Sequence, residues 1–183
     1  MVTSLGVLGE QKPEEVALRL LSLVWIETGN GRAMVQHNWG NLAGEYRGSY
    51  WRPPWYKLTS SSSARMKALH QRMLAGKAPS KFKAYPDRGT GLDDFLALIY
   101  RPQFRPMLEA ARAGNTRAFA DAVHSTGYCP DDACRGERTI ARYEDLRRTF
   151  GPALGLGSGS PLMASGGGWI VLALLWALSK GKL

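Results

Sequence analysis

Glu27 is the residue whose position in this chain best suits acid chemistry. It ends the apolar run of residues 16–26, and the turn Thr28-Gly29-Asn30-Gly31 follows it at once. Beyond this turn, Asn38-Trp39-Gly40-Asn41 groups an aromatic ring with two amides. Aromatic faces stack on sugar rings, and amides hydrogen-bond hydroxyl and acetamido groups. The pattern predicts an acid presented to a polysaccharide; the alternative is a solvated Glu27 at an ordinary helix C-terminus.

Cleavage of a glycosidic bond needs a proton donor for the leaving oxygen, because an alkoxide leaves poorly. A glutamate can donate near neutral pH when burial beside apolar groups raises its pKa, and Trp25 and Ile26 are the neighbours that could do so. We therefore expect Glu27 as the general acid and Asn38, Trp39 and Asn41 as substrate contacts. For these three residues the alternative is a structural turn with a buried Trp39.

Several helices must position these groups. The first is predicted over residues 13–27, with Pro13 in its first turn, Glu14 and Glu15 at its positive end, and Thr28-Gly29 ending it. Short Gly-, Pro- and Ser-marked connections separate the other predicted elements. Further helices are expected over residues 64–74, 92–100, 106–113, 115–124 and 138–150, with an aromatic loop or short hairpin over 45–58 and an extended segment over 81–85.

Two later clusters place polar side chains at turns. The first runs from Lys81 through Tyr85 to Phe95 and is typical of a strand, a turn and a helix start, with Asp93 and Asp94 as first-turn acids. The second, Thr126-Gly127-Tyr128-Cys129-Pro130-Asp131-Asp132, is a loop whose tyrosine either faces a cleft or packs internally.

In this order the clusters resemble the mannosyl-glycoprotein endo-β-N-acetylglucosaminidase-like proteins, glycoside hydrolase family 73, over residues 13–146. The motifs that carry the resemblance are Glu27-Thr28-Gly29, Asn38-Trp39-Gly40-Asn41-Leu42, Phe82-Lys83-Ala84-Tyr85-Pro86-Asp87 and Gly127-Tyr128-Cys129-Pro130-Asp131. The resemblance implies a mainly α, lysozyme-like fold with a small irregular or β-hairpin insertion. It also implies Glu27 as the general acid, Tyr128 as a cleft tyrosine, Tyr85 near the substrate, and no cofactor or metal.

The chain departs from that family because it lacks the second acidic residue that relatives often have. Relatives often carry an acidic residue on a hairpin after the Asn-rich motif, but residues 55–81 contain no Asp or Glu. A single acid can still act if the substrate's acetamido oxygen attacks the anomeric carbon. Attack by the muramic 6-hydroxyl, as in a lytic transglycosylase, is the other route, and the sequence does not choose between them.

The composition of the chain limits the classes of molecule that it is expected to bind. The 183 residues hold 24 Lys and Arg against 15 Asp and Glu, a net charge of +9, which favours polyanions such as nucleic acid, anionic lipid or the bacterial wall. No nucleic-acid motif matches, so nucleic acid is not an expected partner. The charge alone does not name the partner, and peptidoglycan is the partner that the resemblance implies. The two cysteines, Cys129 and Cys134, allow a local disulfide or two thiols. A metal site with His37 or His124 lacks any standard spacing.

The C-terminal part differs sharply from the rest. No charged residue occurs over 151–179; residues 151–167 are a Gly/Ser/Pro-rich linker, and residues 168–183 are a hydrophobic tail. Trp169, Trp176 and the terminal lysines are typical of interfacial anchoring, so we expect a membrane anchor; the alternative is a tail packed on a partner or on the domain. The sequence thus predicts an N-terminal segment (1–12), one lysozyme-like domain (13–150), a linker and a tail.

Three functions fit these features. The first is a peptidoglycan hydrolase cleaving β-1,4 glycan strands, associated with a virion or cell envelope through its tail, since the N-terminus lacks the features of a secretory signal. It would act as a glucosaminidase, a muramidase or a lytic transglycosylase. The second is a non-catalytic wall-binding module, which the missing hairpin acid favours. The third is a structural, membrane-associated virion component working with other assembly proteins.

Overall fold

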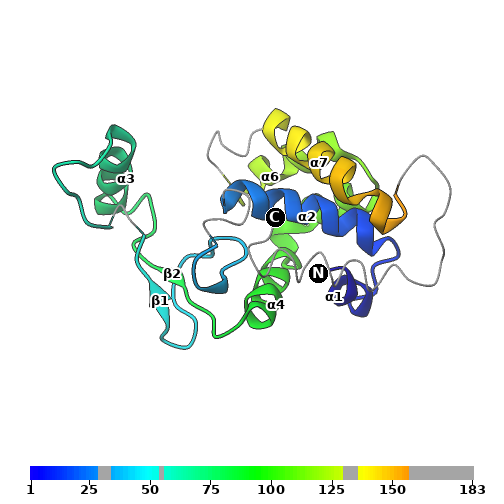
Figure 1. The fold of residues 1–183 in the computed structure, drawn as a ribbon, viewed down its shortest axis with the longest axis horizontal. Helices are drawn as coiled ribbons and strands as arrows, with labels where there is room; N and C mark the ends of the chain where they lie inside the picture. Colours follow the sequence, from blue (N-terminus) through cyan, green and yellow to red (C-terminus); the bar gives the residue numbers. More distant parts are fainter. Residues whose placement is uncertain (29–33, 54–55, 130–135, 157–183) are drawn as a thin grey trace. The chain divides into compact units, whose positions relative to one another are not determined.

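A computed structural model describes residues 1–28, 34–53, 56–129 and 136–156 of the chain. Within these residues the protein is mainly helical, with helices α1 to α7 and one small antiparallel sheet of β1 and β2 (Figure 1). The chain divides into two compact units. The first contains Met1–Arg32 and the chain from Ala97 onward, and the second contains Ala33–Leu96.

The first unit is built around α2 (Pro13–Glu27), which has the bounds that its sequence predicts. Pro13 occupies the first turn, where its missing N–H costs nothing, and Glu14 and Glu15 lie at the positive end of the helix. Val16, Leu20 and Leu23 are fully buried. This unit also contains α5 (Arg105–Arg112), α6 (Thr116–Ser125) and α7 (Gly136–Phe150), and α7 lies alongside α2 in Figure 1.

A buried arginine on α2 joins three helices of this unit. Arg19 is 2% exposed, forms an ion pair with Glu15 (2.5 Å) and donates to the carbonyl of Gly114 (2.8 Å). Its guanidinium also lies 4.4 Å from the ring centre of Tyr143 on α7. Burial alone would raise the pKa of Glu15, but hydrogen bonds from Arg19 and Tyr143 outweigh it and hold that pKa below its usual value. Arg19 therefore fixes α2 against α7 and the α5–α6 turn.

The N-terminal segment forms a helix that the sequence analysis did not predict, α1 (Val2–Val7), which packs on α2 through the fully buried Leu5. Glu10 follows it with its side chain 4% exposed, accepting a two-pronged hydrogen bond from Arg112 on α5 and another from Tyr100. The hydrogen bond from Arg112 lowers the pKa of Glu10, against the opposing effect of burial. The first twelve residues thus belong to the fold of the first unit.

Glu10→Gln should destabilise the protein by about 2 kcal/mol at pH 7, because it leaves Arg112 without its buried anionic partner. The folded-state pKa of Glu10 lies below its unfolded value, so this stabilisation is complete above the unfolded pKa and is lost as the pH falls through the folded pKa. Denaturant unfolding of both proteins from pH 7 to pH 3 checks this. A difference in unfolding free energy that stays constant below about pH 4 would contradict the assignment.

The chain continues to pack after α7 ends at Phe150. Leu18, Tyr143, Leu146 and Phe150 form a buried cluster, and Leu154 and Leu156 are half-buried against it. These two leucines lie in the residues assigned from composition to the linker. The apolar packing of the first unit therefore extends to residue 156.

A chain ending at Leu156 should be more stable than one ending at Phe150 by about 2 kcal/mol, because two half-buried leucines are lost in the shorter form. Thermal and urea unfolding of the two truncated proteins measures the difference. The full chain carrying Leu154→Ala and Leu156→Ala is the matched control and should lose a similar amount. Equal stability of both truncated proteins would show that the packing of the first unit ends with α7.

The second unit contains the sheet. Strand β1 (Tyr50–Trp51) pairs antiparallel with β2 (Phe82–Lys83), placing Trp51 opposite Phe82 with their rings 5.0 Å apart and stacked. The expected hairpin over 45–58 therefore supplies one strand and the extended segment 81–85 supplies the other. Between them lies α3 (Ala64–Leu74), with the predicted bounds and with Ser63 capping its first turn by accepting from the Met66 N–H.

Helix α4 (Arg88–Ile99) begins four residues before the predicted start at Leu92. Asp87 starts it: its carboxylate accepts from the N–H and the hydroxyl of Thr90, both at 2.8 Å, and the backbone bond is the main cause of its lowered pKa. The expectation that Asp93 and Asp94 are first-turn acids is therefore wrong, because Asp87 caps the helix and moves both residues into its second turn. This change of register gives Asp94 another partner, described below.

The other predicted helices lie within two residues of their expected bounds, as α5, α6 and α7 show. Three predicted features lie outside the described residues: the Gly29-Asn30-Gly31 turn, Cys134 in the Tyr128–Cys134 loop, and the hydrophobic tail 168–183. Among the helices of the described part, none is long and apolar enough to cross a membrane.

Candidate functional site

The six predicted site residues fall into two groups. Glu27 and Tyr128 belong to the first unit, and Asn38, Trp39, Asn41 and Tyr85 belong to the second. Each group is described within its own unit.

Glu27 is the last residue of α2, as predicted, and it is half-buried. The next residue fixes the helix end: Thr28 is fully buried, and both its N–H (2.9 Å) and its hydroxyl (2.6 Å) donate to the carbonyl of Val24. The Val24 carbonyl therefore accepts the last backbone bond of the helix and a second bond from a side-chain hydroxyl. This closure holds Glu27 at one position at the end of a rigid helix.

Tyr128 is positioned by the end of α6. The hydroxyl of Thr126 donates to the carbonyl of Ala122 (2.7 Å), and the N–H of Gly127 donates to the carbonyl of His124 (3.0 Å). Gly127 has φ +72°, a left-handed conformation that a glycine adopts without strain and that ends many helices. The chain turns there and directs Tyr128 inward, where its ring meets that of Phe104 edge-on at 5.8 Å.

Glu27 and Tyr128 interact electrostatically. Burial raises the pKa of Tyr128 well above its usual value, and the charge of Glu27 raises it further. The phenol therefore stays protonated over the whole physiological pH range, beside a carboxylate that ends a helix. In this arrangement Glu27 can give a proton, and the neutral Tyr128 can orient the Glu27 carboxyl.

The general-acid role expected for Glu27 predicts that Tyr128→Phe reduces glycan cleavage by about 10- to 100-fold. The unfolding free energy should change by less than about 1 kcal/mol, because only one hydroxyl is removed. Activity against pH is the informative measurement. A tyrosine that orients the Glu27 carboxyl should shift the limb of the profile governed by that acid, whereas a tyrosine that only packs should leave the profile in place. Tyr100→Phe, at a half-buried tyrosine that donates to Glu10 in the same unit, is the matched control.

In the second unit, Asn38 is fully buried and its amide holds the surrounding chain together. Its Nδ2 donates to the carbonyls of Leu42 and Lys83, both at 3.0 Å, and its Oδ1 accepts from the N–H of Leu42 at 2.7 Å. Asn38 thus ties its own loop to β2. Three internal hydrogen bonds use most of the capacity of one amide, so in this structure Asn38 builds the loop and does not present a free amide.

Trp39 and Tyr85 are also buried. Trp39 is 8% exposed and its indole N–H donates to the carbonyl of Arg88 (3.0 Å), which matches the alternative interpretation of this cluster as a turn with a buried tryptophan. Tyr85 is 3% exposed and donates to Asp94 at 2.5 Å. Asn41 is half-buried, so its side chain is the most accessible of the four. Its backbone has φ +47°.

The loop that carries these residues has unusual backbone conformations. Gln36, His37, Asn41 and Arg47 all have positive φ, between 47° and 57°, which costs energy in residues other than glycine. Gly91 on α4 makes part of this possible, because a Cβ there would lie 2.0 Å from the carbonyl oxygen of His37. Strained backbone of this kind concentrates at functional loops, so this segment is a candidate site in its own right.

Sequence reasoning missed the pairing of Lys83 with Asp94. Lys83 on β2 forms an ion pair with Asp94 at 2.6 Å, and Tyr85 donates to the same carboxylate oxygen. Burial and the hydrogen bond to Asp94 raise the pKa of Tyr85. The alternation of Lys83 and Tyr85 along one extended segment was the available signal, since residues two apart on a strand share a face.

Cys129, which follows Tyr128, is buried and disulfide-bonded, and Cys134 is the only other cysteine of the chain. Among the described side chains, no three His, Cys, Asp or Glu residues are grouped as a metal ion would require.

Comparison with known proteins gives the chain no relatives: it matches no protein-family model, no curated protein and no solved structure.

Proposed function

We propose that the protein is a glycoside hydrolase of lysozyme-like fold that cleaves the β-1,4 glycan strands of bacterial peptidoglycan, with Glu27 as the general acid. The pairing of Glu27 with Tyr128 carries this proposal. Two motifs separated by a hundred residues, chosen on sequence alone, lie close enough for the charge of Glu27 to act on the Tyr128 hydroxyl. The resemblance predicted both residues as members of one site, and their electrostatic interaction is what that prediction requires.

The local chemistry supports acid catalysis. Glu27 ends a helix that Thr28 and Arg19 hold in place, so its carboxyl can be kept in one orientation toward a leaving oxygen. A general acid fixed in this way typically contributes about 10²- to 10⁴-fold to a rate. The phenol of Tyr128 stays neutral beside this acid, so it adds no charge that would compete with the carboxyl.

The step at the anomeric carbon needs a nucleophile. Residues 46–86 contain no Asp or Glu, so the hairpin acid of the resembled family has no counterpart there. We propose that the substrate supplies the nucleophile, through its acetamido oxygen in a glucosaminidase or its muramic 6-hydroxyl in a lytic transglycosylase. In both routes Glu27 first protonates the leaving oxygen. In the second route it then accepts the proton of the attacking hydroxyl.

The remaining parts of the proposal concern location. The hydrophobic residues 168–183 would anchor the protein in a virion or cell envelope, where other assembly proteins are potential partners. No cofactor takes part. Asn41 and the strained loop around it are the proposed substrate contacts of the second unit, with Trp39, Asn38 and Tyr85 as the framework beneath them.

A wall-binding module without cleavage is the second candidate. The internal hydrogen bonds of Asn38 and the burial of Trp39 favour it, because both side chains expected to grip sugar are engaged in the fold. Under this hypothesis the protein holds the wall, and Glu27 has no chemical role.

Digestion of purified peptidoglycan by the full chain in mild detergent tests the proposal, with the released muropeptides read by mass spectrometry. New reducing ends would identify a hydrolase, and the sugar at the reducing end would name the bond; 1,6-anhydro ends would identify a transglycosylase. If no soluble product forms while the protein pellets with the wall, the binding module is the correct function.

A further inference from the structure

The positive charge of this protein is concentrated in the second unit. Residues 33–96 contain ten Lys and Arg against four Asp and Glu, and within them residues 46–86 contain nine basic residues and no acidic one. The net charge of the whole chain is +9, so this unit carries most of it in about a third of the length. A surface of this kind attracts a partner that carries many negative charges.

The two units differ in whether their arginines form ion pairs with carboxylates. In the first unit most arginines are neutralised by carboxylates; the ion-paired ones are Arg19, Arg105, Arg112, Arg117, Arg142 and Arg148. In the second unit the exposed Arg47 and Arg52 pair with no carboxylate of the described residues. Their charge is therefore available to a ligand.

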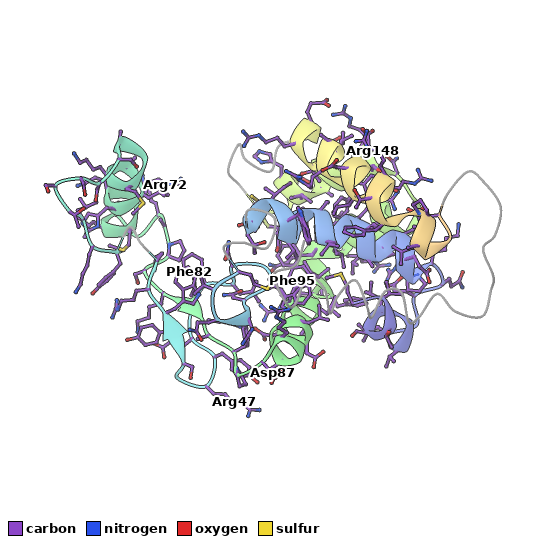
Figure 2. The ribbon with its side chains drawn as sticks, in the orientation of Figure 1. Arg47, Arg72, Phe82, Asp87, Phe95 and Arg148 are labelled. Atoms are coloured by element: carbon purple, nitrogen blue, oxygen red, sulfur yellow. The ribbon has the colours of Figure 1, made fainter. Side chains whose placement is uncertain are left out.

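Tyrosine rings position these two arginines. The Arg52 guanidinium lies 4.0 Å from the ring centre of Tyr56 and 5.3 Å from that of Tyr50, and the Arg47 guanidinium lies 5.4 Å from that of Tyr46. Tyr50, which begins β1, is 38% exposed and also carries the ammonium of Lys81 at 4.3 Å. Figure 2 shows Arg47 extending from the turn that precedes β1. Contacts of this kind restrict an arginine without removing its charge.

We propose that this basic surface, formed by Arg47, Arg52 and the tyrosines they contact, binds the carboxylates of the peptidoglycan strand. Lys81 is not counted in it, because its ammonium forms an ion pair with Glu45. The planar guanidinium offers paired N–H groups that match the two oxygens of a carboxylate. The choice of polymer rests on the proposed function, whose substrate carries such carboxylates on its peptide stems. The surface would hold the wall by charge, independently of the acid chemistry at Glu27.

Local features favour a glycan strand over other polyanions. Single-stranded nucleic acid is held by bases stacked on open aromatic faces. Here the Tyr50 ring already contacts two cations. The Tyr46 ring contacts Arg47, and its centre lies 4.8 Å from that of the Tyr85 ring. The next segment, residues 59–63, is Thr-Ser-Ser-Ser-Ser and mostly exposed, which supplies hydroxyls for a sugar and no apolar side chains for a bilayer.

The test is binding of full-length Glu27→Gln protein to purified sacculi by co-sedimentation, so that cleavage does not enter the measurement. Arg47→Gln with Arg52→Gln should weaken binding about tenfold or more, because hydrogen bonds between charged groups are lost. Arg101→Gln with Arg138→Gln removes the same charge from exposed positions of the first unit and should change binding less than about twofold. Arg52→Lys keeps the charge and should lose part of the affinity.

Chemical amidation of the wall carboxylates should weaken binding of the parent protein as much as the double substitution does. Unchanged binding after either treatment would overturn the proposal. Loss of binding only after hydrofluoric-acid removal of phosphate polymers would also overturn it, as would tighter binding to single-stranded DNA or to phosphatidylglycerol vesicles. A wild-type protein that binds in the expected way but releases no muropeptide would leave this inference standing and remove the proposed hydrolase.

Discussion

Glu27→Gln is expected to lower release of muropeptides from peptidoglycan by about 10³-fold, the middle of the range that a general acid supplies. The substitution keeps the shape of the side chain and removes only its ability to give a proton. Glu27 ends α2, and the helix closure at Thr28 uses backbone and hydroxyl groups that the change does not touch. Cleavage should therefore be lost while folding is kept.

Glu14→Gln on the same helix is the matched control, since it removes one carboxylate of similar burial at the opposite end of α2. It should retain full activity. Circular dichroism, urea unfolding and sedimentation with sacculi should show that Glu27→Gln folds and still binds the wall. Full activity of Glu27→Gln would mean that this glutamate is a helix-end residue without a chemical role, and the hydrolase proposal would need another acid.

Helix bounds set by local chemistry could be predicted from the sequence. Pro13 and the two acids after it start α2, Ser63 caps α3, and both helices have the expected bounds. The start of α4 was missed because two signals compete: Asp93 and Asp94 look like first-turn acids, but Asp87 accepts two hydrogen bonds from Thr90 and starts the helix earlier. Capping by one well-placed side chain outweighs the preference of acids for a first turn.

The roles of polar side chains depended on distant partners and were harder to predict. Asn38 has the residue type of a sugar ligand, but the carbonyl of Lys83, far along the chain, takes one of its amide protons. The ion pair of Asp94 with Lys83 likewise joins two different elements, α4 and β2, so the sequence around Asp94 does not indicate it. The cations that contact tyrosine rings in the second unit, Arg47, Arg52 and Lys81, are likewise spread along the sequence, so no short basic motif indicates the surface.

Arg19→Leu is expected to have the largest effect on stability, about 3 kcal/mol, because it leaves Glu15 as a largely buried carboxylate without its cation. It also removes the hydrogen bonds to the Gly114 carbonyl and the Thr116 hydroxyl, and the contact with the Tyr143 ring. Urea unfolding at pH 7 measures the loss. The same substitution should reduce glycan cleavage at temperatures where the protein remains folded, because α2 carries Glu27 and depends on Arg19 for its fixed position.

The double substitution Arg19→Leu with Glu15→Leu separates the two parts of this effect. Replacing both members of a buried ion pair with apolar side chains is often close to neutral, whereas removing one member is costly. The double variant should therefore recover at least half of the lost stability. It should not recover the lost activity to the same extent, because the bonds from Arg19 to the α5–α6 turn remain absent and the chain runs from the end of α6 into Gly127 and Tyr128. A single variant that loses less than about 1 kcal/mol, or a double variant that is less stable than the single one, would show that Arg19 does not anchor α2.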